Sequence, residues 1–244
     1  MKRPAFGPRA LVGSIGLSCA LACLAKPAHA GDARTHDGLY LRLGAGFGYA
    51  SDAVKSDQYA VGVPPAVFTV QVDGTVSGFA GASELALGWS IADGFALGGG
   101  LYSAWIFSPK ADDAAVNVNG ARAGTPVEFD ASSFHLFGPF IDYYFDPLAG
   151  FHAQAGLGYA WLSPGDAHFR GNVLGVPYDV SQSSTGGGGF GFMVGLGDEW
   201  WVSDGFSLGV LARLTAGVMS GESNNVTWNH TAFAPAVLFT ATMN

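Results

Sequence analysis

The chain has 244 residues, of which 12% are charged, 13% are aromatic and 37 are glycine, and its formal net charge is −8. Soluble domains carry about 25% charged residues, so this composition argues against an ordinary cytosolic protein. The acidic balance argues against nucleic acid as a partner.

The first 30 residues have the order of a cleaved secretory signal peptide. Lys2, Arg3 and Arg9 precede an apolar stretch, and Ala28-His29-Ala30 closes the segment, so we expect cleavage after Ala30. Two alternatives are a retained membrane helix, for which the apolar run is short, and a lipoprotein acylated at Cys23, for which Ala20-Leu21-Ala22 is a poor match. Residues 31–37 form a short lead.

Both cysteines, Cys19 and Cys23, belong to the signal, so the mature chain would have no disulfide and no thiolate metal site. Cleavage would leave seven cations against 19 acids, a net charge of −12. We expect no cofactor and no metal. No later apolar run is long enough for a spanning helix, so a membrane span would have to be made of strands.

From residue 38 to 244 the sequence alternates with period 2 and repeats a hairpin unit. Each unit turns at a short Asp/Gly segment followed by an aromatic, as in Asp93-Gly94-Phe95, Gly150-Phe151 and Asp204-Gly205-Phe206. Four longer segments, 51–77, 108–131, 163–188 and 220–230, alternate with these turns. This pattern predicts eight antiparallel strands. The alternation in the longer segments indicates that several of these strands project beyond the membrane. We expect local bulges at Pro139 and Pro235, because proline is unsuited to a strand interior.

One face of every strand is bulky and apolar, whereas the other is rich in glycine and carries the charges. In the first strand, Leu39, Leu41 and Leu43 alternate with Tyr40 and Arg42. A soluble barrel would turn the bulky face inward, but the small, sparsely charged face suits a crowded lumen better than a solvated surface. The sequence therefore predicts an all-β, eight-stranded antiparallel up-and-down transmembrane barrel with short periplasmic turns and long extracellular loops.

The aromatic residues gather at the two ends of the predicted strands, as two membrane interfaces require. The predicted girdle comprises Tyr49, Trp89, Phe95, Trp105, Phe151, Trp161, Trp200 and Phe206.

The polar side chains of the predicted inner face form a candidate network. Buried charges must be paired, so three acids and two arginines on one inner surface indicate internal ion pairs. This set is Arg42, Glu84, Asp142, His152, Gln154, Glu199 and Arg213. It is interpreted as a plug that fixes the barrel, with a gate as the alternative.

The opening strand Leu39–Gly46, the hairpin periods and the final strand through Phe239 resemble the small eight-stranded outer-membrane barrels of Gram-negative bacteria, the OmpA/OmpX/OmpW-type group. The resemblance covers residues 38–244 and carries no diagnostic motif. It implies a Gram-negative outer-membrane location and contact with lipopolysaccharide. That group usually ends on an aromatic residue, whereas this chain ends Met243-Asn244.

We expect a monomer with a filled lumen and a structural or surface-interaction role through its loops, which could bind other proteins. The resemblance implies two alternatives: a narrow OmpW-like channel for small or apolar solutes, and a lipid A-modifying enzyme. For an enzyme the candidates are His135 with Ser132 or Ser133, His168 and His230, but no spacing joins a nucleophile, a base and an acid. We therefore expect no catalytic activity.

Overall fold

The computed structural model describes residue 36 and residues 38–63, 66–118, 121–124, 127–173, 176–182 and 185–244. All of these lie in the second of two units into which the chain divides, residues 33–244. The signal peptide and almost all of the short lead lie outside the described residues, so their predicted boundaries stay predictions. No helix in the described ranges is long and apolar enough to cross a membrane.

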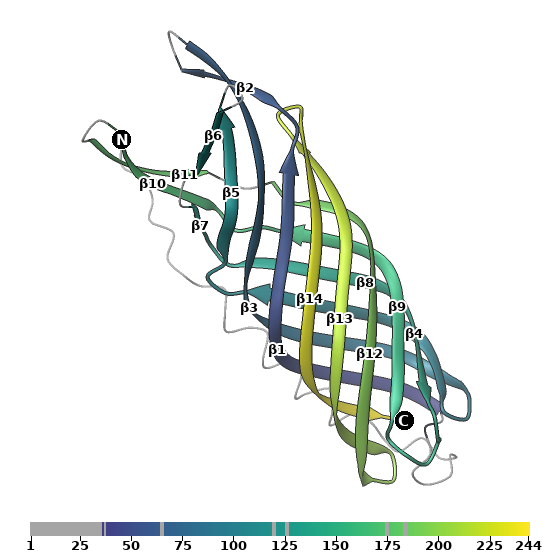
Figure 1. Ribbon diagram of the computed structural model, residues 1–244. Helices are drawn as coiled ribbons and strands as arrows, with labels where there is room; N and C mark the ends of the chain where they lie inside the picture. Colours follow the sequence, from purple (N-terminus) through teal and green to yellow (C-terminus); the bar gives the residue numbers. More distant parts are fainter. Residues whose placement is uncertain are drawn as a thin grey trace, which may run out of the picture. The chain divides into compact units, whose positions relative to one another are not determined.

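The described chain is built from strands that pair antiparallel (Figure 1). Eight of them close a ring: β1 (Gly38–Ser56), β3 (Ala66–Ala92), β4 (Phe95–Ile106), β8 (Ser132–Tyr144), β9 (His152–Ser163), β12 (Gly187–Ser203), β13 (Phe206–Ser223) and β14 (Val226–Met243). The ring closes because β1 pairs with both β3 and β14. The predicted all-β, eight-stranded up-and-down barrel is confirmed.

The register around the ring shows that the strands are staggered. Following paired residues from strand to strand, a line that leaves β1 at Ala45 returns to β1 at Lys55, ten residues further on. Such a stagger requires strands that tilt strongly against the barrel axis. The line runs through Ala45, Ser83, Ser103, His135, Trp161, Gly188, Ser220, Asn229 and Lys55.

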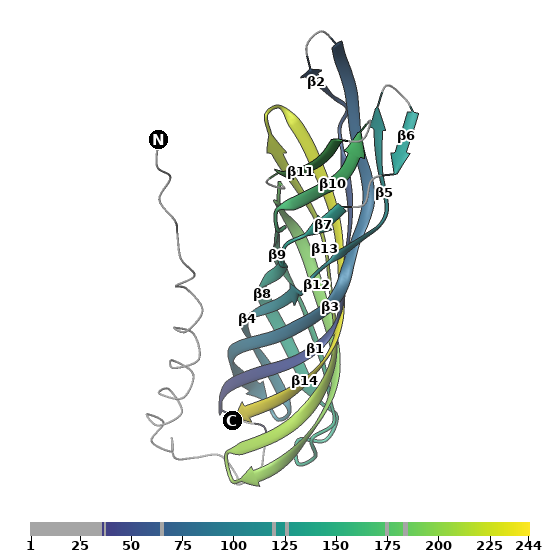
Figure 2. The ribbon, with the colours of Figure 1, turned by 90° about the vertical axis from the view of Figure 1, so that its left-hand side faces the viewer.

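The strands extend beyond the ring at one end, where shorter strands add to them (Figure 2). These are β2 (Tyr59–Val63), β5 (Lys110–Val118), β6 (Ala121–Gly124), β7 (Val127–Phe129), β10 (Ala167–Val173) and β11 (Val176–Gln182). The sheet continues from β3 through β5, β7 and β10 to β11. Three of the predicted long segments thus contain paired strands, as the alternation indicated.

The fourth predicted long segment, 220–230, is instead a continuous hairpin. Ser223 pairs with Val226, and the two residues between them, Asn224 and Asn225, have φ of 54° and 61°. Positive φ at both central positions defines the tight turn that best matches strand twist, and asparagine tolerates it. The expectation of a long loop here was wrong because polar composition outweighed the turn chemistry of the Asn-Asn pair.

The expectation of bulges at Pro139 and Pro235 was also wrong. Pro139 pairs with Gly99 and Pro235 with Leu214, and the register on the other side of each proline continues unchanged. Toward the other neighbouring strand, the pairs at the proline and at the residue before it are missing, because proline has no N–H to donate. The irregularities in the ring lie instead beside the short turns, at Ser90/Ala92 and Trp201/Ser203.

Burial alternates along the ring strands in the sense that the sequence predicts. The apolar residues of β1, β3 and β13 point outward and are largely exposed, for example Leu87 (55%) and Phe47 (55%), whereas Arg42 and Glu84 are buried at 0% and 3%. A water-soluble fold would bury the large apolar side chains and leave the charges in solvent. The outer wall of this barrel therefore matches a hydrocarbon environment, and the interior holds the charges.

Candidate functional site

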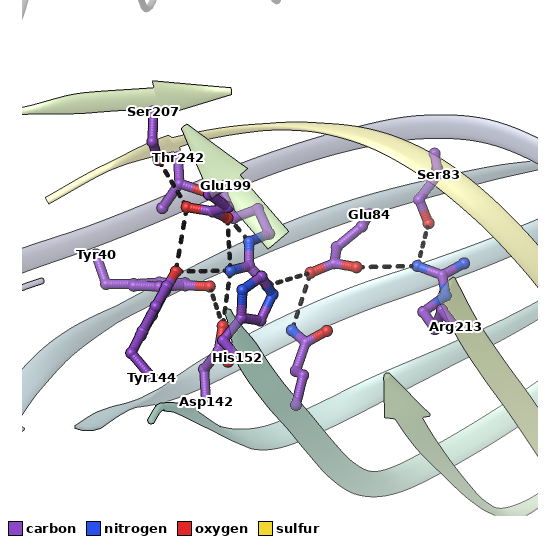
Figure 3. Close-up of polar contacts among 12 residues, drawn as sticks. Tyr40, Ser83, Glu84, Asp142, Tyr144, His152, Glu199, Ser207, Arg213 and Thr242 are labelled. Carbon is purple, nitrogen blue, oxygen red and sulfur yellow. Dashed lines mark hydrogen bonds and ion pairs between the residues drawn. The ribbon is translucent and has the colours of Figure 1, made fainter. Parts of the chain in front are cut away.

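Arg42 is the centre of a polar cluster inside the barrel, and its partners Asp142, Glu199 and Thr242 are labelled in Figure 3. It points inward from β1 at a position paired with Thr242 of β14. Its Nη2 lies 2.7 Å from Asp142 Oδ2 and 2.8 Å from Glu199 Oε1, and its Nε donates to Thr242 Oγ1 over 3.1 Å. One guanidinium thus joins β1 to β8, β12 and β14 across the lumen.

Hydroxyl groups complete the surroundings of the two acids. Tyr40 donates to Asp142 over 2.7 Å, while Ser207 and Thr242 donate to the two oxygens of Glu199 over 2.6 and 2.7 Å. Tyr144 accepts from Arg42 at 2.8 Å and reaches Glu199 at 3.3 Å. Carboxylates with several donors are stabilised in the charged form even where water is excluded.

Glu84 holds a second cluster further along the lumen. Arg213 Nη1 lies 3.2 Å from Glu84 Oε2, and Gln154 donates to Glu84 Oε1 over 2.9 Å. The same Glu84 oxygen is 4.0 Å from Arg42 Nη1, so the two clusters meet. Arg213 also donates to the carbonyl oxygens of Ser83 and Ser103.

The structure places all seven predicted network residues on the inner face, with exposures of 0 to 4%. It joins six of them directly. His152 is the exception, because its Nδ1 donates to the Gly150 carbonyl oxygen over 3.0 Å and its ring lies beside Tyr144 with centroids 4.9 Å apart. Gly197 leaves room for this imidazole, since a Cβ there would lie 2.5 Å from His152 Cε1.

Charges and hydrogen bonds are not fully balanced within this network. Two guanidinium groups face three carboxylates, and Arg42 Nη1, Asp142 Oδ1 and Gln154 Oε1 have no hydrogen-bond partner among the described residues. Buried polar atoms without partners cost free energy. The arrangement favours ion pairing that holds the strands together.

Large apolar side chains fill the lumen beside the polar clusters and beyond them, on the side of the projecting strands. These residues are at most 2% exposed and come from three strands. They are Tyr102, Ile106, Phe134, Leu136, Phe140 and Met193. The unusually heavy inner face of β8 is the main contributor, and the residues fill an interior that eight strands leave only wide enough for side chains.

His36 closes the opposite end, and the sequence had not marked it. Its ring stacks on Tyr144 with centroids 3.4 Å apart and lies 4.5 Å from the ring of Trp201. Its Nδ1 lies 2.9 Å from Asn244 Nδ2, and its backbone accepts from Gly94 and donates to Pro147. His36 is a single histidine in a segment without period-2 alternation, so no sequence pattern predicts this role.

Burial sets the charge state of His36. Desolvation lowers its pKa to about 4, an effect that Arg42 and His152 strengthen and that Glu199 opposes. The ring is therefore neutral at pH 7 and gains a proton only near pH 4. Because the unfolded chain takes up this proton near pH 6.5, the contribution of His36 to stability falls as the pH drops from about 6.5 to 4 and is constant above that range.

We expect His36→Phe to weaken this pH dependence. Between pH 7 and pH 4 the His36 contribution should reach roughly 3 kcal/mol, because a pKa shift of one unit corresponds to about 1.4 kcal/mol. Urea unfolding of both proteins in lipid vesicles at several pH values, followed by tryptophan fluorescence, measures the difference. Identical pH profiles would contradict the buried position of His36.

Among the candidates for catalysis whose side chains the structure describes, no triad forms. His135 pairs with Ser103, not with Ser132 or Ser133, at 2.8 Å between Nδ1 and Oγ. Ser132 donates to the Asp130 carbonyl oxygen and accepts from the Gly165 N–H. His230 contacts Asp52 at 2.8 Å and the carbonyl oxygen of Thr185. The side chain of His168 lies outside what the structure describes.

The predicted girdle residues all point outward. Tyr49, Trp89, Trp105, Phe151, Trp200 and Phe206 are exposed by 37% or more, and Phe95 and Trp161 are partly buried by neighbouring rings. From Phe151, just before β9, to Trp161 the chain advances ten residue steps, which span about 23 Å across the membrane at ~3.3 Å per step and a tilt of about 45°. The apolar band of membrane barrels is similar in height.

Within the described ranges no group of three or more histidine, cysteine, aspartate or glutamate side chains could hold a metal ion. No protein-family model matches the sequence, and no curated protein matches it.

Solved structures similar to this chain include three outer-membrane β-barrel proteins. OprG, an outer membrane protein of Pseudomonas aeruginosa, is 15% identical with a TM-score of 0.40 over 86% of this chain and 99% of its own. Ail of Yersinia pestis, solved with the heparin analogue sucrose octasulfate, is 10% identical with a TM-score of 0.34 over 84% and 99%. The outer membrane protease OmpT of Escherichia coli is 9% identical with a TM-score of 0.35 over 89% and 100%.

Proposed function

We propose that this chain is a β-barrel of the Gram-negative outer membrane whose lumen is closed by side chains and whose role is structural or surface-binding. The observation that carries the proposal is the inverted burial of the closed ring, with Leu87 and Phe239 exposed at 55% and 66% and Arg42 at 0%. A closed ring leaves no unpaired edge in the hydrocarbon, as a strand-built span requires. In bacteria, such barrels belong to the outer membrane.

A filled lumen favours a plug over a channel. Phe134, Leu136 and Phe140 of β8 lie across the lumen at 0 to 2% exposure, and the Arg42 network spans it between these side chains and the short turns. A water path would need both layers to rearrange together. Breaking buried ion pairs is costly, so the closed state is favoured.

The projecting sheet is the part best suited to binding a partner. It continues through β5, β7, β10 and β11, and β11 ends the strand order among the described residues. A free strand edge can accept an extended segment of another protein. We propose that partners reach the protein here, and that the barrel itself is a monomer because the ring has no edge for a second copy.

Conductance in planar bilayers tests the closed lumen. We expect no steady conductance from the wild-type protein, and a measurable one from Phe134→Ala/Phe140→Ala, which removes two buried rings. Phe137→Ala is the matched control, since Phe137 lies on the same strand but points outward at 58% exposure.

A steady open state of the wild-type protein would favour the alternative, a narrow channel for small or apolar solutes. Wild-type silence together with silence of the double variant would place the barrier elsewhere in the lumen. The remaining alternative, modification of lipid A, is tested by mass spectra of lipid A from cells with and without the protein, which we expect to be the same.

A further inference from the structure

The outer wall of the barrel carries a hydrogen-bonded pair of serine and histidine among its apolar side chains. Ser103 of β4 and His135 of β8 are directly paired residues, both on the outward-facing side, with His135 Nδ1 2.8 Å from Ser103 Oγ. Ser103 is only 5% exposed although it points outward, whereas His135 is partly exposed. The imidazole thus covers the serine hydroxyl, and the imidazole itself faces the environment of the barrel.

Two tryptophans enclose this histidine. The ring of Trp161 stacks on His135 with centroids 4.9 Å apart, and the ring of Trp105 meets it edge-on at 6.1 Å. Both tryptophans belong to the aromatic girdle on the side of the projecting strands. Indole rings are enriched where acyl chains meet lipid headgroups, so Ser103 and His135 lie at that boundary.

The chemistry of the imidazole leaves one nitrogen without a protein partner. Nδ1 is taken by Ser103, and no described residue forms a hydrogen bond with Nε2 of His135. An unsatisfied polar group costs several kcal/mol in hydrocarbon. A tautomer with Nδ1 accepting from the serine hydroxyl leaves Nε2–H as a donor, and the acceptor that a bilayer offers at this depth is the carbonyl oxygen of an acyl chain.

We propose that Ser103, His135, Trp105 and Trp161 form a binding site on the outer wall for one membrane lipid. The His135 Nε2–H donates to an acyl carbonyl oxygen of this lipid, and the two indoles hold its first methylene groups. Ser103 is a positioning residue, because its hydroxyl fixes the tautomer and the ring orientation. The proposal rests on the proposed insertion into a membrane.

Lipid retention tests the site, using native mass spectrometry of the purified barrel with added phospholipids. The probes are a diacyl phosphatidylethanolamine and its dialkyl ether analogue, which has the same headgroup and no carbonyl. We expect the wild-type protein to retain the diacyl lipid about fivefold better, since one hydrogen bond of about 1 kcal/mol changes affinity by that factor. His135→Phe should abolish the preference and Ser103→Ala should weaken it. Phe137→Leu, two residues along the same outward face, should keep it.

Equal retention of the two lipids by the wild-type protein would overturn the proposal, as would a preference that His135→Phe leaves unchanged. A preference that follows headgroup charge, tested with phosphatidylglycerol, would also overturn it. The proposed function fails differently, because a protein that does not insert would retain neither lipid and would lack protected strands in vesicles.

Discussion

Replacing Arg42 with methionine should lower the free energy of unfolding by about 3–5 kcal/mol, because it leaves buried acids without a counterion. Asp142 and Glu199 lie 2.7 and 2.8 Å from this guanidinium, and all three side chains are at most 1% exposed. Methionine has a similar volume, so packing changes little and the lost charge accounts for the effect. Urea unfolding in phospholipid vesicles, monitored by tryptophan fluorescence, measures it.

The matched control removes the two acids together with the arginine. The triple variant Arg42→Met, Asp142→Asn, Glu199→Gln has no unpaired charge, so most of the lost stability should return. Arg213→Met should cost less than Arg42→Met, because Arg213 neutralises a single acid, Glu84, which keeps its bond from Gln154. A loss below about 1 kcal/mol for Arg42→Met would contradict the network as the element that joins the strands.

The second large effect concerns charge on the outer wall. Leu85 is 47% exposed and lies in the middle of the apolar band, next to Leu43 and Leu101 on the neighbouring strands. Leu85→Arg should cost about 2–4 kcal/mol, the value for arginine at the bilayer midplane. Val202, 61% exposed and beside a short turn, is the matched position, and Val202→Arg should cost only about 0–1 kcal/mol.

The two variants should differ only if lipid surrounds the barrel. In a water-soluble barrel both arginines would be solvated, and surface substitutions there change stability by less than about 0.5 kcal/mol. The same urea unfolding in vesicles decides between the two cases, and equal small losses would contradict insertion.

The sequence was sufficient for the number and facing of the ring strands and for the positions of the three short turns, since each depends on local pattern. Period-2 alternation placed Arg42 and Glu84 inside and Leu87 outside, and Asp-Gly pairs marked the short turns, including Gly94 with φ of 69°. The same alternation placed seven polar residues on one inner face. The alternation does not show which of these residues contact one another, because the contacts depend on the stagger of ten residues around the ring.

Features that depend on contacts between residues distant in the sequence could not be predicted from local patterns. His36 has its role through rings of two strands and the last residue, which no local pattern records. The partner of His135 is Ser103, 32 residues away, because adjacent strands bring them together where closer serines on the same strand cannot reach. The Asn224-Asn225 turn was missed although its signal is local, since polar composition was taken for a loop.

Nitroxide scanning along β13 in lipid vesicles is the most direct test of the central claim, that lipid surrounds the bulky face and the charges lie inside. The only cysteines are Cys19 and Cys23, so single cysteines can be placed cleanly in a protein without them. Labels at Leu208, Val210 and Ala212 should be accessible to dissolved oxygen and protected from a water-soluble nickel chelate, while labels at Ser207 and Leu211 should be shielded from both. Nickel access at Leu208, Val210 and Ala212, or oxygen access without alternation, would contradict it.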